Sequence, residues 1–195
     1  MVARMSSDAH TRCVDMLRIS LERNPRAKTL IRALNGRGCL TTALFFHCVD
    51  CSTHNPLEFG SEPVQQGGGY IPGAGIRICE EVLQSQKHMD ETLAHELIHA
   101  FDDCRAQLDF ANCDHHACTE VRAANLSGDC RFMNEMFRMK FGLKAQHQTC
   151  VKRRATLSLL SNPNCNASKE QAAAAVDRVF PKCFRDWAPF SNIPT

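Results

Sequence analysis

The stretch TLAHELIHAFDDCR, residues 92–105, decides how the rest of this sequence is interpreted. It lies in a segment, from Ser85 or Lys87 to about Cys104, whose pattern predicts one helix. Residues four positions apart, as His95 and His99 are, lie one turn apart on the same face of a helix. Apolar neighbours such as Leu93 and Leu97 indicate that the helix is buried on its other side. The stretch therefore predicts a buried helix that directs two imidazole groups toward one point.

The residues HELIH have the spacing that places two zinc ligands and a general base on one helix. In this interpretation His95 and His99 bind the ion, and Glu96 reaches the water that the ion holds. Zinc lowers the pKa of its water to about 7, so Glu96 can take a proton and the hydroxide can attack a peptide carbonyl. The alternative is a surface cluster without a metal. The apolar neighbours favour the metal, because buried polar side chains need partners.

A catalytic zinc ion needs a third protein ligand and an open position for water. Glu120 follows on a segment that we expect to be a separate helix. It would complete a set of two histidines and one glutamate, a known arrangement for catalytic zinc. His115, His116 and Asp103 are the alternatives for this position. The sequence favours Glu120 and leaves the other three open.

Two aspartates lie near the C-terminal end of the same helix and are candidates for orienting the metal ligands. Asp102 shares the face of His95 and His99, so we expect it to orient a ligand rather than to bind the ion. Asp103 follows His99 by one helical turn and could play the same part.

The composition describes an ordinary globular protein. The chain has 195 residues, of which 44% are hydrophobic, and a net charge of +2. This weak charge gives no reason to expect a nucleic-acid partner. We expect a flexible N-terminus over residues 1–11 and a single metallopeptidase domain over residues 12–195. No apolar run approaches the roughly 20 residues of a membrane-spanning helix, and the N-terminus lacks the apolar core of a signal peptide.

The twelve cysteines are an even number, spread along the whole chain. So many thiols indicate disulfides in an oxidising compartment, or metal sites in a reducing one. Cys48 and Cys51 could form half of a zinc-binding knuckle, but no second pair with this spacing completes it, so two disulfide halves are favoured. Cys104 and Cys118 are expected to be disulfide partners that tie the active-site helices together.

The order of the expected elements gives the fold class. A small sheet precedes the active-site helix, and a helical, cysteine-rich body follows it, which makes an α+β protein. The segment 67–79 is expected to be a hairpin or an edge strand, and its edge is a candidate for holding a substrate peptide as an added strand. Besides the active-site helix, the patterns predict helices over residues 13–23, 27–34, 117–127, 129–141, 148–161 and 168–180.

Four longer motifs carry a resemblance to a known family. The motifs HELIHAFDDCR, ACTEVRAANLSGDC, FGLKAQHQTCVKRRATLS and VDRVFPKCFRDWAPFSNIP resemble those of the mitochondrial inner membrane protease and ATP synthase assembly factor family. The resemblance is strong from about Met89 to the C-terminus and looser over residues 12–80. The joined motifs are far more specific than HELIH alone.

The resemblance implies a zincin-like metallopeptidase with one catalytic Zn²⁺ ion. It gives His95 and His99 the role of metal ligands and Glu96 the catalytic role. It further implies peripheral attachment to the mitochondrial inner membrane on its intermembrane-space side, maturation of the precursor of ATP synthase subunit a, and help in assembling the membrane sector of that enzyme. Import through an oxidative relay would explain many disulfides without a cleavable presequence.

Two other functions are weighed against this one. The chain could be an assembly chaperone or scaffold that keeps the fold without catalysis, or a nuclear binding partner in DNA repair. The intact Glu96 favours the peptidase over the scaffold, because a scaffold has no need of a carboxylate beside the two histidines. The cysteine content argues against the nucleus, where thiols stay reduced.

Overall fold

The computed structural model describes residues 2–53, 67–130 and 143–194. The chain divides into two compact units, Met1–Arg105 and Ala106–Thr195. The first unit holds helices and a small sheet, and the described part of the second is helical, which confirms the α+β class. The expectation of one metallopeptidase domain over residues 12–195 stays a prediction.

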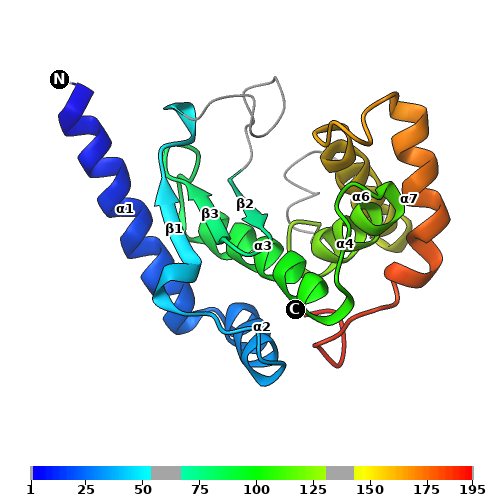
Figure 1. Cartoon of the computed structure of the whole chain (residues 1–195), viewed down its shortest axis with the longest axis horizontal. Coiled ribbons are helices and arrows are strands. Elements are labelled where there is room, and N and C mark those ends of the chain that lie inside the picture. Colours follow the sequence, from blue (N-terminus) through cyan, green and yellow to red (C-terminus); the bar gives the residue numbers. More distant parts are fainter. Residues whose placement is uncertain (1, 54–66, 131–142, 195) are drawn as a thin grey trace. The chain divides into compact units, whose positions relative to one another are not determined.

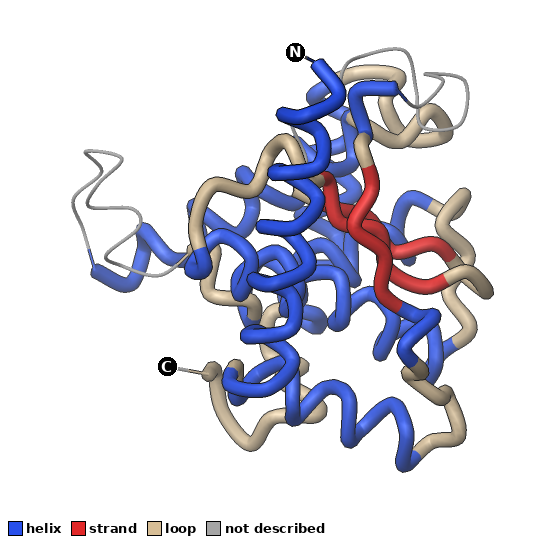
Figure 2. The backbone as a smooth tube through the Cα atoms, turned by 90° about the vertical axis from the view of Figure 1, so that its left-hand side faces the viewer, coloured by secondary structure: helices blue, strands red, loops and turns tan. Residues whose placement is uncertain are grey.

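The first unit is built on a three-stranded sheet (Figure 2). Strands β1 (Phe46–Val49), β2 (Gly68–Ile71) and β3 (Gly75–Cys79) lie in the order β1-β3-β2. The central strand β3 runs parallel to β1 and antiparallel to β2. Ile76 and Ile78 of β3 are fully buried. The hairpin expected within residues 67–79 is confirmed, whereas β1 was not predicted.

A close approach between two segments explains the glycine that begins β3. Gly75 has a φ of +99°, a backbone conformation that residues with a side chain rarely adopt. A Cβ atom at this position would lie 2.4 Å from the backbone oxygen of Phe45, which precedes β1. Glycine is therefore required where the start of β3 meets the start of its parallel neighbour.

Two helices precede the sheet (Figure 1). Helix α1 (Val2–Arg23) ends where Asn24 caps helix α2 (Pro25–Gly36), with the Asn24 side chain accepting a hydrogen bond from the amide of Arg26. Proline in the first helical turn suits this start, because its missing N–H would have no partner there. The sequence places the start of the first helix at Cys13, but α1 begins at Val2.

Helix α3 (Gln86–Ala106) has 21 residues and contains no proline or glycine. Its first turns contact α1, since the Gln86 side chain donates to the Met16 carbonyl at 3.0 Å and Ser20 donates to Asp90. The side chain of Thr92 lies against Gly68 of β2. These contacts hold α3 against α1 and against the sheet, and the predicted helix is confirmed.

Three helices form the described core of the second unit. They are α4 (Cys113–Leu126), α6 (Leu143–Leu160) and α7 (Lys169–Cys183), and each packs against the other two. Ser168 accepts a hydrogen bond from the amide of Gln171, so the predicted cap of the last helix is confirmed. Most of the helix expected over residues 129–141 lies outside the described residues.

A fully buried arginine fastens the C-terminal segment to this core. The guanidinium of Arg122, on α4, forms an ion pair with Asp186 and donates hydrogen bonds to the carbonyls of Asp186 and Ala188. A buried charge must be paired in this way to offset its lost hydration. The residues that follow α7 are therefore part of the fold of the second unit.

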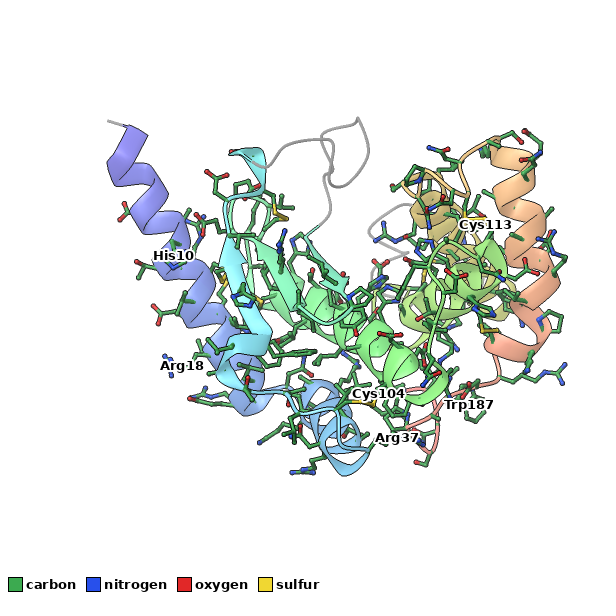
Figure 3. All side chains as sticks on the ribbon, in the orientation of Figure 1. His10, Arg18, Arg37, Cys104, Cys113 and Trp187 are labelled. Carbon is green, nitrogen blue, oxygen red and sulfur yellow. A yellow bond between two sulfur atoms is a disulfide. The ribbon has the colours of Figure 1, made fainter. Side chains whose placement is uncertain are left out.

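All twelve cysteines form disulfides, so the disulfide interpretation of Cys48 and Cys51 is confirmed. The expected pairing of Cys104 with Cys118 is wrong. Cys104, at the end of α3, pairs with Cys39 in the loop after α2 (Figure 3), and Cys118 on α4 pairs with Cys183 at the end of α7. Each bridge joins cysteines of one unit: Cys13–Cys48, Cys39–Cys104 and Cys51–Cys79 in the first, and Cys113–Cys165, Cys118–Cys183 and Cys130–Cys150 in the second.

Candidate metal centre

Helix α3 holds three predicted site residues within a buried run. Glu96 and His99 are 7% and 5% exposed, and His95 is partly buried. The apolar Leu93 and Leu97 beside them are fully buried. Such burial is costly for a carboxylate and two imidazole rings unless they have strong partners. The position of these residues therefore favours a functional site over a surface cluster.

The two histidines of α3 lie next to one another. Their ring centroids are 4.8 Å apart, with the planes at 75°, and their ligand nitrogens lie within 4.8 Å of each other. Since a zinc ion binds each imidazole nitrogen at about 2.0–2.1 Å, one ion between the rings can contact both. The donor types and their separation on this helix fit a metal of this kind.

The two aspartates that follow form hydrogen bonds within the first unit. Asp102 is 2% exposed and accepts a hydrogen bond from Nε of Arg105 at 3.0 Å. Asp103 accepts one from the hydroxyl of Tyr70 on β2, at 2.8 Å. Burial of the tyrosine, and then its bond to Asp103, raise the pKa of Tyr70. The expected role of both aspartates in orienting ligands stays a prediction.

Helix α4 of the second unit carries the three other candidate ligands. Its N-terminus is capped by Asn112, whose side chain accepts hydrogen bonds from the amides of Asp114 and His115. This cap starts the helix at Cys113 and not at residue 117, where the apolar pattern places it. The backbone N–H of Asp109 donates to Nδ1 of His115, which is exposed.

The ring of His116 connects an amide to a buried carboxylate. Nδ2 of Asn162 lies 2.8 Å from Nδ1 of His116, and Nε2 of His116 lies 3.3 Å from Oε1 of Glu120. An amide nitrogen only donates, so Nδ1 accepts and Nε2 carries the proton that it donates to Glu120. Both ring nitrogens of His116 are thus engaged. Glu120 is 6% exposed, and its carboxylate is held in orientation by this bond.

Two of these contacts do not follow from the sequence patterns. The sequence places Tyr70 only in a glycine-rich hairpin and offers His116 only as a competing ligand. His116 and Glu120 are four residues apart on one helix, a spacing that allows such a bond and that the sequence already contains. The contact from Tyr70 to Asp103 joins residues distant in the sequence, so no local pattern signals it.

Comparison with known proteins now identifies the family. The model of the peptidase M76 family matches residues 11–191. The chain belongs to this family. The human "mitochondrial inner membrane protease ATP23 homolog" is 46% identical over 188 residues, which cover 95% of this chain and 72% of the human protein. The Schizosaccharomyces pombe protein "mitochondrial inner membrane protease atp23" is 42% identical over 185 residues, covering 93% and 92% of the two chains.

Membership of the M76 family makes this chain a peptidase, and more narrowly a metallopeptidase. The names of its relatives agree with the family resemblance of the sequence motifs and identify a protease of the mitochondrial inner membrane. None of the helices in the described parts of the chain is long and apolar enough to span a membrane. No solved structure matches the chain.

Proposed function

We propose that this M76 peptidase is a zinc endopeptidase in which His95, His99 and Glu120 hold one Zn²⁺ ion. The observation that carries the proposal is the pair of adjacent imidazole rings on the buried face of α3, with Glu96 beside them. The family supports a metal, since its members are metallopeptidases. For the third ligand, the buried carboxylate of Glu120 is a better candidate than the exposed His115 or the engaged His116.

The bound ion would supply a water of lowered pKa and would polarise the peptide carbonyl. The remaining steps fall to the side chains. Glu96 takes a proton from the attacking water and passes it to the departing amine nitrogen. Asp102 and Asp103, at the C-terminal end of α3, help to keep the histidines oriented. Strand β2, which is an edge strand among the described residues, binds the substrate as an added extended strand.

We also propose the substrate and the place of action. The peptidase acts at the inner membrane from the intermembrane space, attached peripherally, where it matures the precursor of ATP synthase subunit a and assists assembly of the membrane sector. The names of the relatives support the membrane. Six disulfides support an oxidising compartment, because disulfides are rare where thiols are kept reduced.

The deciding experiment separates metal binding from catalysis in the same preparation. Zinc content and cleavage of a subunit-a precursor peptide are measured for wild type, Glu96→Gln and His99→Ala. We expect Glu96→Gln to keep its zinc and to lose about 10²- to 10⁴-fold in cleavage rate, since only the general base is removed. His99→Ala should lose both. Unchanged cleavage by Glu96→Gln would refute the assigned role of Glu96, and zinc retained by His99→Ala would refute the site.

A further inference from the structure

Helix α2 and the loop that follows it form an unusually basic part of the first unit. Between Arg23 and Val49 the sequence has no aspartate or glutamate, while it contains Arg26, Lys28, Arg32 and Arg37. We call residues 25–44 the basic segment. In a chain with a net charge of only +2, such a one-sided run marks a local positive surface.

Two cations of the basic segment, Lys28 and Arg32, face water, whereas Arg26 is partly buried. Ala27, Leu30 and Leu34 point into the protein and are buried, which leaves Lys28 and Arg32 on the opposite, exposed face one turn apart. Within the described residues neither Lys28 nor Arg32 is paired with a carboxylate. Both cations are therefore available to an external anionic surface.

The loop after α2 carries the most exposed large apolar side chains of the described residues. Leu40 is 70% exposed and Leu44 is 80% exposed, whereas the next, Leu157, is 46% exposed. Soluble surfaces seldom gather large apolar side chains in one place without a function. Two leucines at this exposure within five residues are a feature to be explained.

This loop is anchored to the rest of the first unit at both of its ends. The Cys39–Cys104 disulfide fixes its start (Figure 3), and the contact of Phe45 with Gly75 fixes its end. The exposed leucines are thus presented by a supported loop.

One side-chain contact brings the leucines and the cations together. Oδ1 of Asn35 accepts hydrogen bonds from both the backbone N–H and the hydroxyl of Thr41, at 2.9 and 3.1 Å. Asn35 continues the exposed stripe of α2 that contains Lys28 and Arg32, at helical spacings of four and then three residues. The leucine-bearing loop therefore folds back onto the basic face of the helix.

We propose that the basic segment is a docking surface for an anionic lipid bilayer. Leu40 and Leu44 enter the interfacial region, and Lys28, Arg32 and Arg37 lie against the lipid phosphates. Single exposed leucines on a loop suit a bilayer, which needs no complementary groove, and basic side chains are attracted to anionic headgroups. This deepens the proposed peripheral attachment and rests on it, but it concerns the lipid contact and not the peptidase chemistry.

The test is co-flotation of the full chain with vesicles of phosphatidylcholine and phosphatidylglycerol, compared with pure phosphatidylcholine. We expect binding to the anionic vesicles that weakens as salt is added, because exposed charges are screened. Lys28→Gln with Arg32→Gln should weaken binding about 25-fold, at roughly fivefold for each charge. Leu40→Ser with Leu44→Ser should weaken it at least about tenfold.

Matched controls come from the second unit. Lys182→Gln with Arg185→Gln removes the same charge from exposed positions, and Leu157→Ser removes an exposed leucine, so both should bind as wild type does. Thr42→Asp is a variant that spares the fold, because Thr42 is exposed and caps the following turn only through its backbone. It places a carboxylate between the two leucines and should also weaken binding about tenfold or more.

Cleavage of a soluble peptide is measured on every variant, because this keeps the two proposals apart. Loss of vesicle binding with unchanged cleavage supports the docking surface. Wild type that fails to bind anionic vesicles, or Thr42→Asp that binds as wild type does, overturns it. Wild type that binds vesicles but cleaves nothing leaves the docking surface intact and counts against the proposed peptidase site instead.

Discussion

Tyr70 is the only tyrosine of the chain, so its ionisation can be observed without interference from another tyrosine. Its hydroxyl donates to Asp103, one helical turn beyond His99. Partial burial of the tyrosine and the neighbouring carboxylate both disfavour the phenolate, and both raise the pKa of Tyr70. This one hydrogen bond therefore links the edge strand β2 to the helix that carries the histidines.

A spectrophotometric titration of tyrosinate absorbance tests this contact. The wild-type midpoint should lie well above the value of about 10 seen in unfolded chains. Asp103→Asn removes the negative charge, so its midpoint should fall toward that value yet remain above it because burial persists. Since the folded pKa is raised, the stabilisation is complete below about pH 10 and is lost as the pH rises through the folded pKa. An unchanged midpoint in Asp103→Asn would contradict the contact.

His116 offers a second test at the scale of single residues. If Glu120 is a zinc ligand, the Nε2–H of His116 helps to hold its carboxylate in place. Loss of such a supporting bond typically weakens metal affinity about 10- to 100-fold. We expect His116→Gln to show this loss in a competition titration with a chelator. His115→Gln is the matched control, and equal weakening by both variants would argue against a specific role for His116.

Among the structural elements, the β2–β3 hairpin depends on two glycines for different reasons. Gly73 has a φ of +76° and open space around it, so only its backbone conformation excludes a side chain. Gly75 has both a positive φ and the Phe45 oxygen where a Cβ would lie. Alanine substitutions at these two positions can therefore distinguish the cost of backbone strain from the cost of a steric clash.

Denaturant unfolding of three alanine variants, with the disulfides intact, measures these effects. Gly73→Ala should cost about 1–2 kcal/mol, the usual penalty of the left-handed conformation. Gly75→Ala should cost more than about 2 kcal/mol, because backbone must also move. Gly36→Ala, at the end of α2 with nothing within 4 Å, should be neutral or gain up to about 1 kcal/mol. Equal costs at Gly73 and Gly75 would contradict the steric account.

The elements that the sequence predicts well are those with local signals. The centre of α3 follows from its apolar spacing, and the start of α7 from the Ser168 cap. Strand β1 was missed because its partner is β3, which is distant in the sequence, and its four residues show no alternation. The predicted end of α7 at Phe180 is early, since Pro181 lies in the last helical turn and the helix reaches Cys183.

In the candidate site too, the residues with a local sequence signal are predicted, and those that depend on distant contacts are not. The relative positions of His95, Glu96 and His99 can be predicted from the sequence, because helix geometry fixes the spacing of residues one turn apart. The roles of Glu120, Tyr70 and His116 depend on contacts that no periodicity encodes. Disulfide pairing is also nonlocal, which is why the presence of bridges was predictable while the partners of Cys104 and Cys118 were not.

Along the chain, the six disulfides fall into two sets of three. The last cysteine of the first set is Cys104 and the first of the second set is Cys113. No bridge spans the residues between them, so the backbone over residues 105–112 is the sole covalent link between the two halves. Oxidation of one half therefore needs no thiol from the other.

Denaturing electrophoresis can test whether any disulfide joins the two halves. A protease recognition site is inserted between Gln107 and Asp109, and the chain is cleaved there. After cleavage, the unreduced sample should already run as two bands, each with its own loops still closed and migrating faster than its reduced form. A single unreduced band that separates only with reductant would contradict the pairing. Each half can therefore close its three bridges and lock its own fold while the other half is still reduced and unfolded.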